Sequence, residues 1–170
     1  IPLALLGLCI LAFGLLIPRL GFYWDDWPSI WFYHLEGASI FKDVFYSDRP
    51  LLGHVFSLTM PIIGYSAIGW QLFALVIRWL VSFALWWSLK ALWPKRLFEV
   101  TLIALLFTVY PGFSQQWIAI TYGHIFIPYA AYLFSMGLTI TAVRRAKWFW
   151  PLTILAILTD ALAIFLYEYY

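Results

Sequence analysis

Long apolar runs separated by short polar breaks dominate the hydropathy pattern of this chain. A helix needs about 20 residues to cross the hydrocarbon core of a bilayer. The first run is nearly that long and is closed by Pro18 and Arg19. The pattern predicts an all-α polytopic membrane protein with about five transmembrane helices, at residues 1–17, 70–93, 97–113, 122–143 and 148–167.

The segment between the first two spans is polar and aromatic, and it predicts two shorter helices. Residues 28–36 form a candidate helix that Gly37 stops, and its aromatic side chains suit the membrane surface. Residues 51–63 are apolar, but at about 1.5 Å per residue they cover only roughly 20 Å. We therefore expect a second surface helix that does not cross the bilayer.

Composition supports a membrane location, because the chain is 65% hydrophobic and only 11% charged. A soluble domain carries about 25% charged residues. Aromatic residues make up 22% and suit interfacial belts, while a net charge of +2 is too small to suggest nucleic-acid binding. The chain begins at Ile1 and stops within an aromatic run at Tyr170. We expect one transmembrane domain, 1–170, that forms the N-terminal part of a longer protein.

Charge predicts the orientation of the helices. Two loops that the five-helix arrangement places on one side hold six of the ten basic residues: Lys90, Lys95, Arg96, Arg144, Arg145 and Lys147. The positive-inside rule makes that side cytoplasmic. The same arrangement puts six of the eight acidic residues on the outer face: Asp25, Asp26, Glu36, Asp43, Asp48 and Glu168. If residues 51–63 crossed instead, the acidic residues would divide between the two faces.

Two adjacent carboxylates, Asp25 and Asp26, follow the first span within the sequence Tyr23-Trp24-Asp25-Asp26-Trp27. One interpretation makes them the chemical centre of a lipid-dependent transferase. The other is that one of them caps the helix that begins near Pro28, since a carboxylate there accepts from free backbone N–H groups. A neighbouring carboxylate and flanking tryptophans would raise the pKa of such a group.

Arg78 and Asp160 lie deep inside predicted spans, at similar depths from the outer face. Intramembrane charges are normally paired or face a cavity. We expect either a structural ion pair between the two, or an Arg78 that binds a lipid phosphate while Asp160 orients it, because a guanidinium donates two parallel bonds to a phosphate.

The three histidines, His34, His54 and His124, all fall near the predicted outer face. Their spacing does not predict a zinc site, and packing or interfacial roles are typical of such isolated histidines. A Mg²⁺ or Mn²⁺ ion could bind Asp25 or Asp26, because hard cations prefer carboxylates. The sequence itself requires no cofactor.

Four short motifs together resemble a known family. They are Tyr23-Trp24-Asp25-Asp26-Trp27, Asp48-Arg49-Pro50-Leu51-Leu52, Gly69-Trp70-Gln71-Leu72 with Arg78 after it, and the ending Glu168-Tyr169-Tyr170. This order is similar to the N-terminal half of GT-C fold glycosyltransferases, polytopic enzymes related to protein O-mannosyltransferases and aminoarabinose transferases. The similarity is strongest from Tyr23 to Arg78.

The resemblance implies a sugar donor on a polyprenyl-phosphate carrier, used at the outer face of the bacterial cytoplasmic membrane. It implies that Asp25 is the catalytic base or a metal ligand, supported by Asp26. Positive charge or a metal must stabilise the departing phosphate, and Arg49 or Arg78 could supply the charge. His54 and Glu168 complete the candidate substrate-binding residues.

The resemblance leaves the acceptor open between a lipid, a glycan and a protein, and it assigns the activity to the full-length protein. Two alternatives remain at the level of sequence. One is a membrane transporter or lipid-binding protein without transferase activity, which would use Arg78 and Asp160 as a substrate path. The other is a structural subunit with a degenerate transferase fold.

Overall fold

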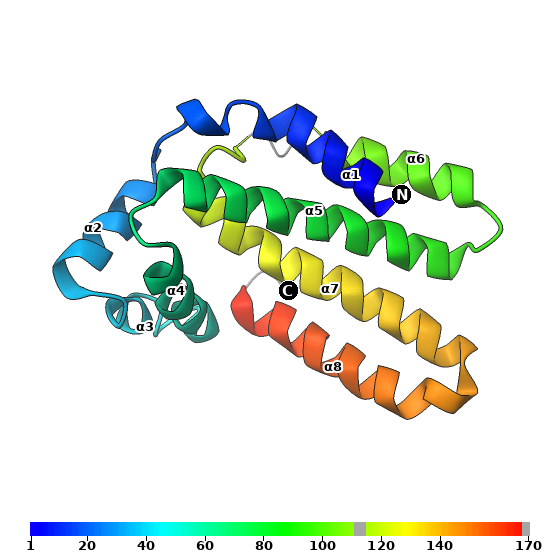
Figure 1. Ribbon diagram of the computed structural model, residues 1–170. Coiled ribbons are helices and arrows are strands. Elements are labelled where there is room, and N and C mark those ends of the chain that lie inside the picture. Colours follow the sequence, from blue (N-terminus) through cyan, green and yellow to red (C-terminus); the bar gives the residue numbers. More distant parts are fainter. Residues whose placement is uncertain (111–114, 168–170) are drawn as a thin grey trace.

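The computed structural model describes residues 1–110 and 115–167, and all regular structure within these ranges is helical (Figure 1). The α-helices are α1 (Pro2–Cys9), α2 (Asp26–Glu36), α3 (Ile40–Val44), α4 (Pro50–Ile63), α5 (Ala67–Leu92), α6 (Leu97–Thr108), α7 (Ala119–Arg144) and α8 (Phe149–Leu166). A π-helical turn at Ile10–Gly14 and 3₁₀ turns at Ile17–Arg19 and Ala146–Trp148 extend α1 and precede α8. The predicted all-α, polytopic fold class is confirmed.

Four helical segments are long and apolar enough to cross a membrane: Pro2–Arg19, Ala67–Leu92, Ala119–Arg144 and Ala146–Leu166. They correspond to four of the five predicted spans. The remaining one, residues 97–113, is shorter than predicted, because α6 has 12 residues and ends at Thr108. By helical rise α6 covers about 18 Å. Residues 111–113 of that predicted span lie outside the described residues.

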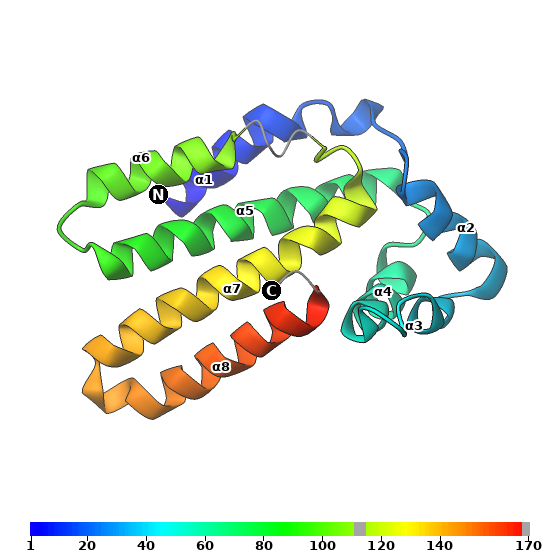
Figure 2. The same cartoon turned by 180° about the vertical axis from the view of Figure 1, so that it is seen from behind.

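The long helices α5 and α7 run side by side in the same direction (Figures 1 and 2). At one end the rings of Trp70 and His124 lie 5.7 Å apart, and at the other end Trp87 and Thr141 line one cleft. Gly137 permits this close packing, because a Cβ there would collide with the ring of Trp87. Small residues are the usual means of close helix approach in membranes.

Three further helices, α1, α6 and α8, are antiparallel to α5 and α7. The indole N–H of Trp79 donates to the carbonyl of Pro2 at 2.9 Å, and Gln71 reaches the carbonyl of Gly21 at 3.4 Å, so α1 is antiparallel to α5. Helix α6 is likewise antiparallel to α5, and α8 is antiparallel to α7. The alternation agrees with the direction of each predicted span.

Helices α2, α3 and α4 gather at one end of the long helices, and α4 is seen nearly along its axis while α5 and α7 lie across the view (Figure 1). The predicted surface helix 51–63 therefore does not run along the bundle, as expected. Helix α2 starts two residues before its predicted start and ends at Gly37, whose φ of 75° favours glycine. A buried apolar cluster joins these short helices to α5, α7 and α8: Ile30, Phe41, Leu52, Phe56, Met60, Trp70, Ala74, Ala119, Ile120 and Leu166.

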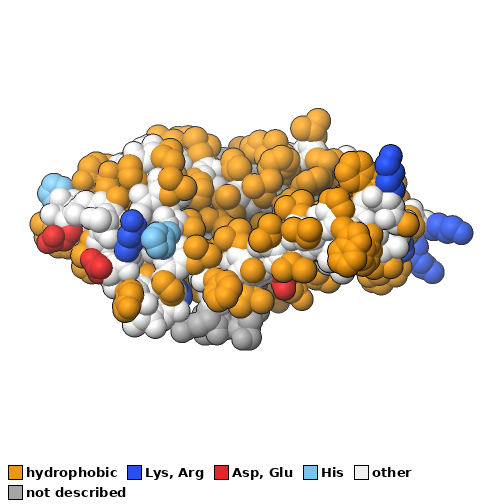
Figure 3. All heavy atoms as spheres, turned by 90° about the horizontal axis from the view of Figure 1, so that it is seen from below, with side chains coloured by type: hydrophobic (Ala, Val, Ile, Leu, Met, Phe, Trp, Pro, Cys, Tyr) orange, Lys and Arg blue, Asp and Glu red, His pale blue; other side chains and the backbone are white. Residues whose placement is uncertain are grey.

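Charge separates along the molecule in the way that the sequence predicts. The end that carries α2–α4 and the starts of α5 and α7 is called the loop end, and the opposite end, with the six loop lysines and arginines, the basic end. On the face drawn in Figure 3, hydrophobic side chains cover most of the length between them, and Lys and Arg side chains protrude at the basic end. This distribution is typical of a protein that spans a membrane.

Candidate functional site

A tight turn at residues 23–27 presents the acidic pair at the loop end. Trp24 adopts a φ of 45°, a left-handed conformation that costs a non-glycine residue about 1–3 kcal/mol. Strain of this size persists only where the surroundings hold the backbone, and it concentrates at functional sites. The turn leaves Trp24, Asp25 and Trp27 exposed and buries Asp26 completely.

Asp26 anchors the turn to the start of α7. Its carboxylate accepts backbone N–H bonds from Ala119 at 3.0 Å, Ile120 at 2.9 Å and Thr121 at 3.3 Å. A fourth N–H, from Tyr23, lies 3.5 Å from Oδ2. Because the first N–H groups of a helix have no partner within it, Asp26 completes the N-terminus of α7.

This geometry corrects the capping interpretation of the pair. Asp25 holds the N-cap position of α2, but its side chain makes no capping bond to that helix. The cap is formed by Asp26, and it serves α7 rather than the helix that follows in sequence. The carbonyl of Asp25 accepts from the Ser29 hydroxyl at 3.2 Å, which fixes the backbone at the first turn of α2.

Burial raises the pKa of Asp26 from its ordinary value of 3.8 to about 6, and the four backbone N–H bonds oppose that rise. The sequence attributed a raised pKa in the pair to a neighbouring carboxylate and flanking tryptophans; in the structure the pKa of Asp26 is raised, and the cause is burial. At neutral pH Asp26 is therefore mostly ionised and accepts from the dipole end of α7. The oxygens of Asp26 accept these backbone bonds, whereas the carboxylate of Asp25 is exposed.

Trp117 joins the turn to a small cavity in the bundle. Its ring makes edge-to-face contacts with Tyr23, at 5.1 Å between centroids, and with Trp24, at 6.4 Å. The cavity holds about 240 Å³ and lies between the end of the first span, α5 and the segment before α7. It is lined by Ala12, Phe13, Leu16, Leu20, Gln71, Gln116 and Trp117. An apolar wall with a few polar groups is typical of a ligand site.

Arg78 lies beside this cavity, buried between α5 and the end of α6. Its Nη2 and Nε donate to the carbonyl of Thr108 at 2.7 and 3.2 Å, and its Nη1 donates to Oε1 of Gln116 at 3.2 Å. The guanidinium also lies 4.0 Å from the centroid of the Phe13 ring. This carbonyl belongs to the last residue of α6, and among the described residues Arg78 satisfies it.

The predicted ion pair with Asp160 is wrong. Within the described ranges, Arg78 and Asp160 form no ion pair, because Arg78 points from α5 toward the end of α6 while Asp160 belongs to α8. Two turns earlier on α5, Gln71 donates to the carbonyl of Trp117 at 2.9 Å. Arg78 and Gln71 thus support non-helical backbone inside the bundle, which apolar surroundings tolerate only when its polar groups are satisfied.

Arg49 and His54 lie at the start of α4, away from the buried Arg78. Nε of Arg49 lies 3.2 Å from a carboxylate oxygen of Asp48, and its guanidinium stands 5.1 Å from the centroid of the Tyr167 ring. A cleft of about 440 Å³ separates the start of α4 from the end of α8. His54 is exposed. Glu168, the remaining candidate, lies outside the described residues.

His124 has a packing role, as predicted for an isolated histidine. Its ring stacks on Phe56 at 3.8 Å between centroids and is almost fully buried. Nδ1 donates to the carbonyl of Ile120 at 2.7 Å, and Nε2 lies within hydrogen-bond distance of the Thr59 hydroxyl, at 2.9 Å. These contacts fix α4 across the start of α7.

The structure adds three residues that the sequence interpretation did not select: Gln71, Gln116 and Trp117. Gln71 lies in the motif Gly69-Trp70-Gln71-Leu72, where a polar side chain within an apolar run could have identified it. No feature of the sequence marks Gln116 or Trp117. Among the described residues, no group of three His, Cys, Asp or Glu side chains could hold a metal ion, and a Mg²⁺ or Mn²⁺ ion on Asp25 stays a prediction. No family model, curated protein or solved structure matches this chain.

Proposed function

We propose that this protein is a membrane glycosyltransferase that moves a sugar from a polyprenyl-phosphate carrier to an acceptor hydroxyl at the loop end. One observation carries the proposal: an exposed carboxylate, Asp25, adjoins a buried one, Asp26, that is bonded to the start of α7. This pairing gives a free base on a fixed backbone. A base held in place needs little reorganisation during the reaction.

In the proposed reaction Asp25 accepts the proton of the acceptor hydroxyl. The hydroxyl oxygen forms a bond to the anomeric carbon of the sugar, and the bond from that carbon to the phosphate oxygen breaks. The polyprenyl phosphate leaves with the electron pair. No step requires an oxidant, a reductant or a bound metal.

Arg78 and the cavity beside it support a site for the phosphate-bearing lipid. Arg78 donates to Gln116, and Gln116 lines the cavity together with apolar side chains of the first span. A buried positive charge acts over several ångströms where the dielectric constant is low. Arg78 thus favours a developing phosphate charge through Gln116, while its other bonds hold the end of α6.

Orientation is part of the same proposal. The basic end lies in the cytoplasm by the positive-inside rule, so the loop end faces the outside of the bacterial cytoplasmic membrane. The exposed tryptophans of the turn suit the headgroup region, where an amphiphilic carrier presents its sugar. Arg49 and His54, at the start of α4, would then contact the sugar phosphate or the acceptor.

A donor assay tests the function. Full-length protein in sealed vesicles receives radiolabelled sugar on polyprenyl phosphate or, separately, on a nucleoside diphosphate, together with a membrane extract as acceptor source. We expect labelled product and released polyprenyl phosphate only from the lipid-linked donor. Transfer from the nucleotide donor alone, or accumulation of the intact lipid-linked donor without bond cleavage, would replace this proposal with a different transferase or with a transporter.

A further inference from the structure

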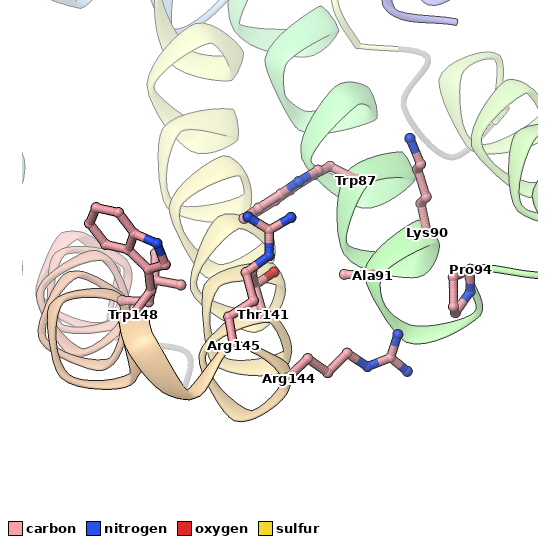
Figure 4. Close-up of a pocket in the computed structure, with 9 residues that line it drawn as sticks. Trp87, Lys90, Ala91, Pro94, Thr141, Arg144, Arg145 and Trp148 are labelled. Atoms are coloured by element: carbon pink, nitrogen blue, oxygen red, sulfur yellow. The ribbon is translucent and has the colours of Figure 1, made fainter.

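We propose that a cleft at the basic end binds the phosphate headgroup of an anionic phospholipid. The cleft holds about 550 Å³ and lies where the ends of α5 and α7 meet the start of α8 (Figure 4). Its lining residues are Trp87, Lys90, Ala91, Pro94, Thr141, Arg144, Arg145, Trp148 and Leu152. It lies at the opposite end from Asp25, so it is separate from the proposed transfer site.

The cleft is cationic without compensation from its own lining. Three of its residues are basic, Lys90, Arg144 and Arg145, and its lining contains no acidic residue. The closest acidic residue in sequence, Glu99, is already within 3.4 Å of the Arg96 guanidinium. The Lys90 ammonium lies 4.9 Å from the centroid of the Trp86 ring, so the two arginines supply most of the positive charge at the opening. A local excess of positive charge favours an anionic ligand.

Arg144 and Arg145 are exposed side chains that line the opening of the cleft. Arg144 donates to the carbonyl of Leu92 at 2.9 Å, which holds its side chain across the end of α5. In Figure 4 the side chain of Arg145 extends toward Trp87, and that of Arg144 extends toward Pro94. Each guanidinium can donate two parallel N–H bonds to a phosphate that enters the cleft.

The remaining lining favours a lipid over free phosphate. Trp87, Trp148 and Leu152 supply apolar surface beside the arginines, and Trp148 is half exposed. This combination matches an amphiphile whose phosphate meets the arginines while its glycerol and upper acyl chains meet the rings. Basic pockets between transmembrane helices on the cytoplasmic side bind anionic headgroups in this way.

The test compares lipid binding by wild-type protein and by two charge-matched variants. Full-length protein in an uncharged detergent is titrated with phosphatidylglycerol, phosphatidylcholine or inorganic phosphate, and bound lipid is counted by native mass spectrometry together with the melting temperature. Arg144→Gln/Arg145→Gln removes two charges from the cleft. Lys95→Gln/Lys147→Gln removes two charges from the same end, outside the cleft lining.

We expect phosphatidylglycerol to bind and raise the melting temperature, with affinity lowered about 30-fold by the arginine variant and little by the lysine variant. Phosphatidylcholine and inorganic phosphate should bind far more weakly. Equal loss in both variants would overturn the proposal by showing only general attraction to the basic end. Equal affinity of wild-type protein for phosphatidylglycerol and for phosphatidylcholine or inorganic phosphate would also overturn the proposal. That result does not depend on whether the variants fold. Sugar transfer does not enter either measurement.

Discussion

The carboxylate of Asp26 accepts the backbone N–H of Ile120 at 2.9 Å, across 94 residues of sequence. Together with the bonds from Ala119 and Thr121, this contact makes the acidic turn and the start of α7 one structural unit. The first span, the loop end and the fourth predicted span are therefore coupled at one side chain.

The first prediction concerns this anchor. Asp26→Ala leaves buried N–H groups of α7 without an acceptor, and each such loss costs about 1–3 kcal/mol. We expect a clearly lower melting temperature in detergent. Asp25→Ala removes an exposed side chain that makes no capping bond, so it should change stability by about 0.5 kcal/mol or less. Equal losses from the two substitutions would contradict the assignment of the anchor.

The pH dependence of stability tests the same residue. The folded-state pKa of Asp26 is raised to about 6, so the folded chain holds that proton more tightly than the unfolded chain. The resulting stabilisation is complete below about pH 4 and is lost as the pH rises through 6. We expect the melting temperature of wild-type protein minus that of Asp26→Asn to grow as the pH falls from about 7 to about 4.5. A difference that shrinks over this range would mean that the folded-state pKa is not raised.

Arg78 supplies a third prediction. Arg78→Met leaves the carbonyl of Thr108 unsatisfied inside the bundle, at a cost of about 1–3 kcal/mol. Because Asp160 does not pair with Arg78, Asp160→Leu should not restore the stability that Arg78→Met removes. The measurement is the melting temperature of both single variants and the double variant in detergent. Recovery in the double variant would show that the two charges meet.

The sequence was sufficient for features that depend on local pattern. Apolar runs located the four long helices, Gly37 located the end of α2, and the length of residues 51–63 separated α4 from the spans. Lysine and arginine counts located the basic end. Each of these inferences uses residues that are neighbours along the chain, where helix periodicity and membrane thickness act directly.

The missed features depend on contacts between distant segments. Capping preference applied to Asp26 pointed to the adjacent helix, whereas the carboxylate reaches α7 through the fold. Depth alone paired Arg78 with Asp160, but the rotation of α5 about its axis sends the guanidinium to Thr108. The hydropathy pattern did not predict that α6 ends at Thr108, because the apolar run continues past that residue. Sequence gives the depth of a residue better than the direction in which it points.

Topology is tested with single cysteines at Ser47, Lys95 and Ala146 in a Cys9→Ala background. Ser47 lies in an exposed turn at the loop end, and the other two are exposed at the basic end. An impermeant thiol reagent applied to intact cells should label only the Ser47 position. Labelling at Lys95 or Ala146, with Ser47 protected, would reverse the orientation and remove the acidic turn from the outer face.

Sugar transfer by Asp25→Asn in the full-length protein tests whether Asp25 is the general base. Asparagine keeps the size of the side chain but is a far poorer base, so the melting temperature should stay near wild type. Loss of a general base typically lowers the rate about 10²–10⁴-fold. Asp43→Asn, which removes another exposed acid of the same loop, is the matched control and should transfer normally. We expect a folded Asp25→Asn protein whose transfer from polyprenyl-phosphate sugar is reduced by at least about 10²-fold; transfer at the wild-type rate would contradict the role of Asp25 as the base.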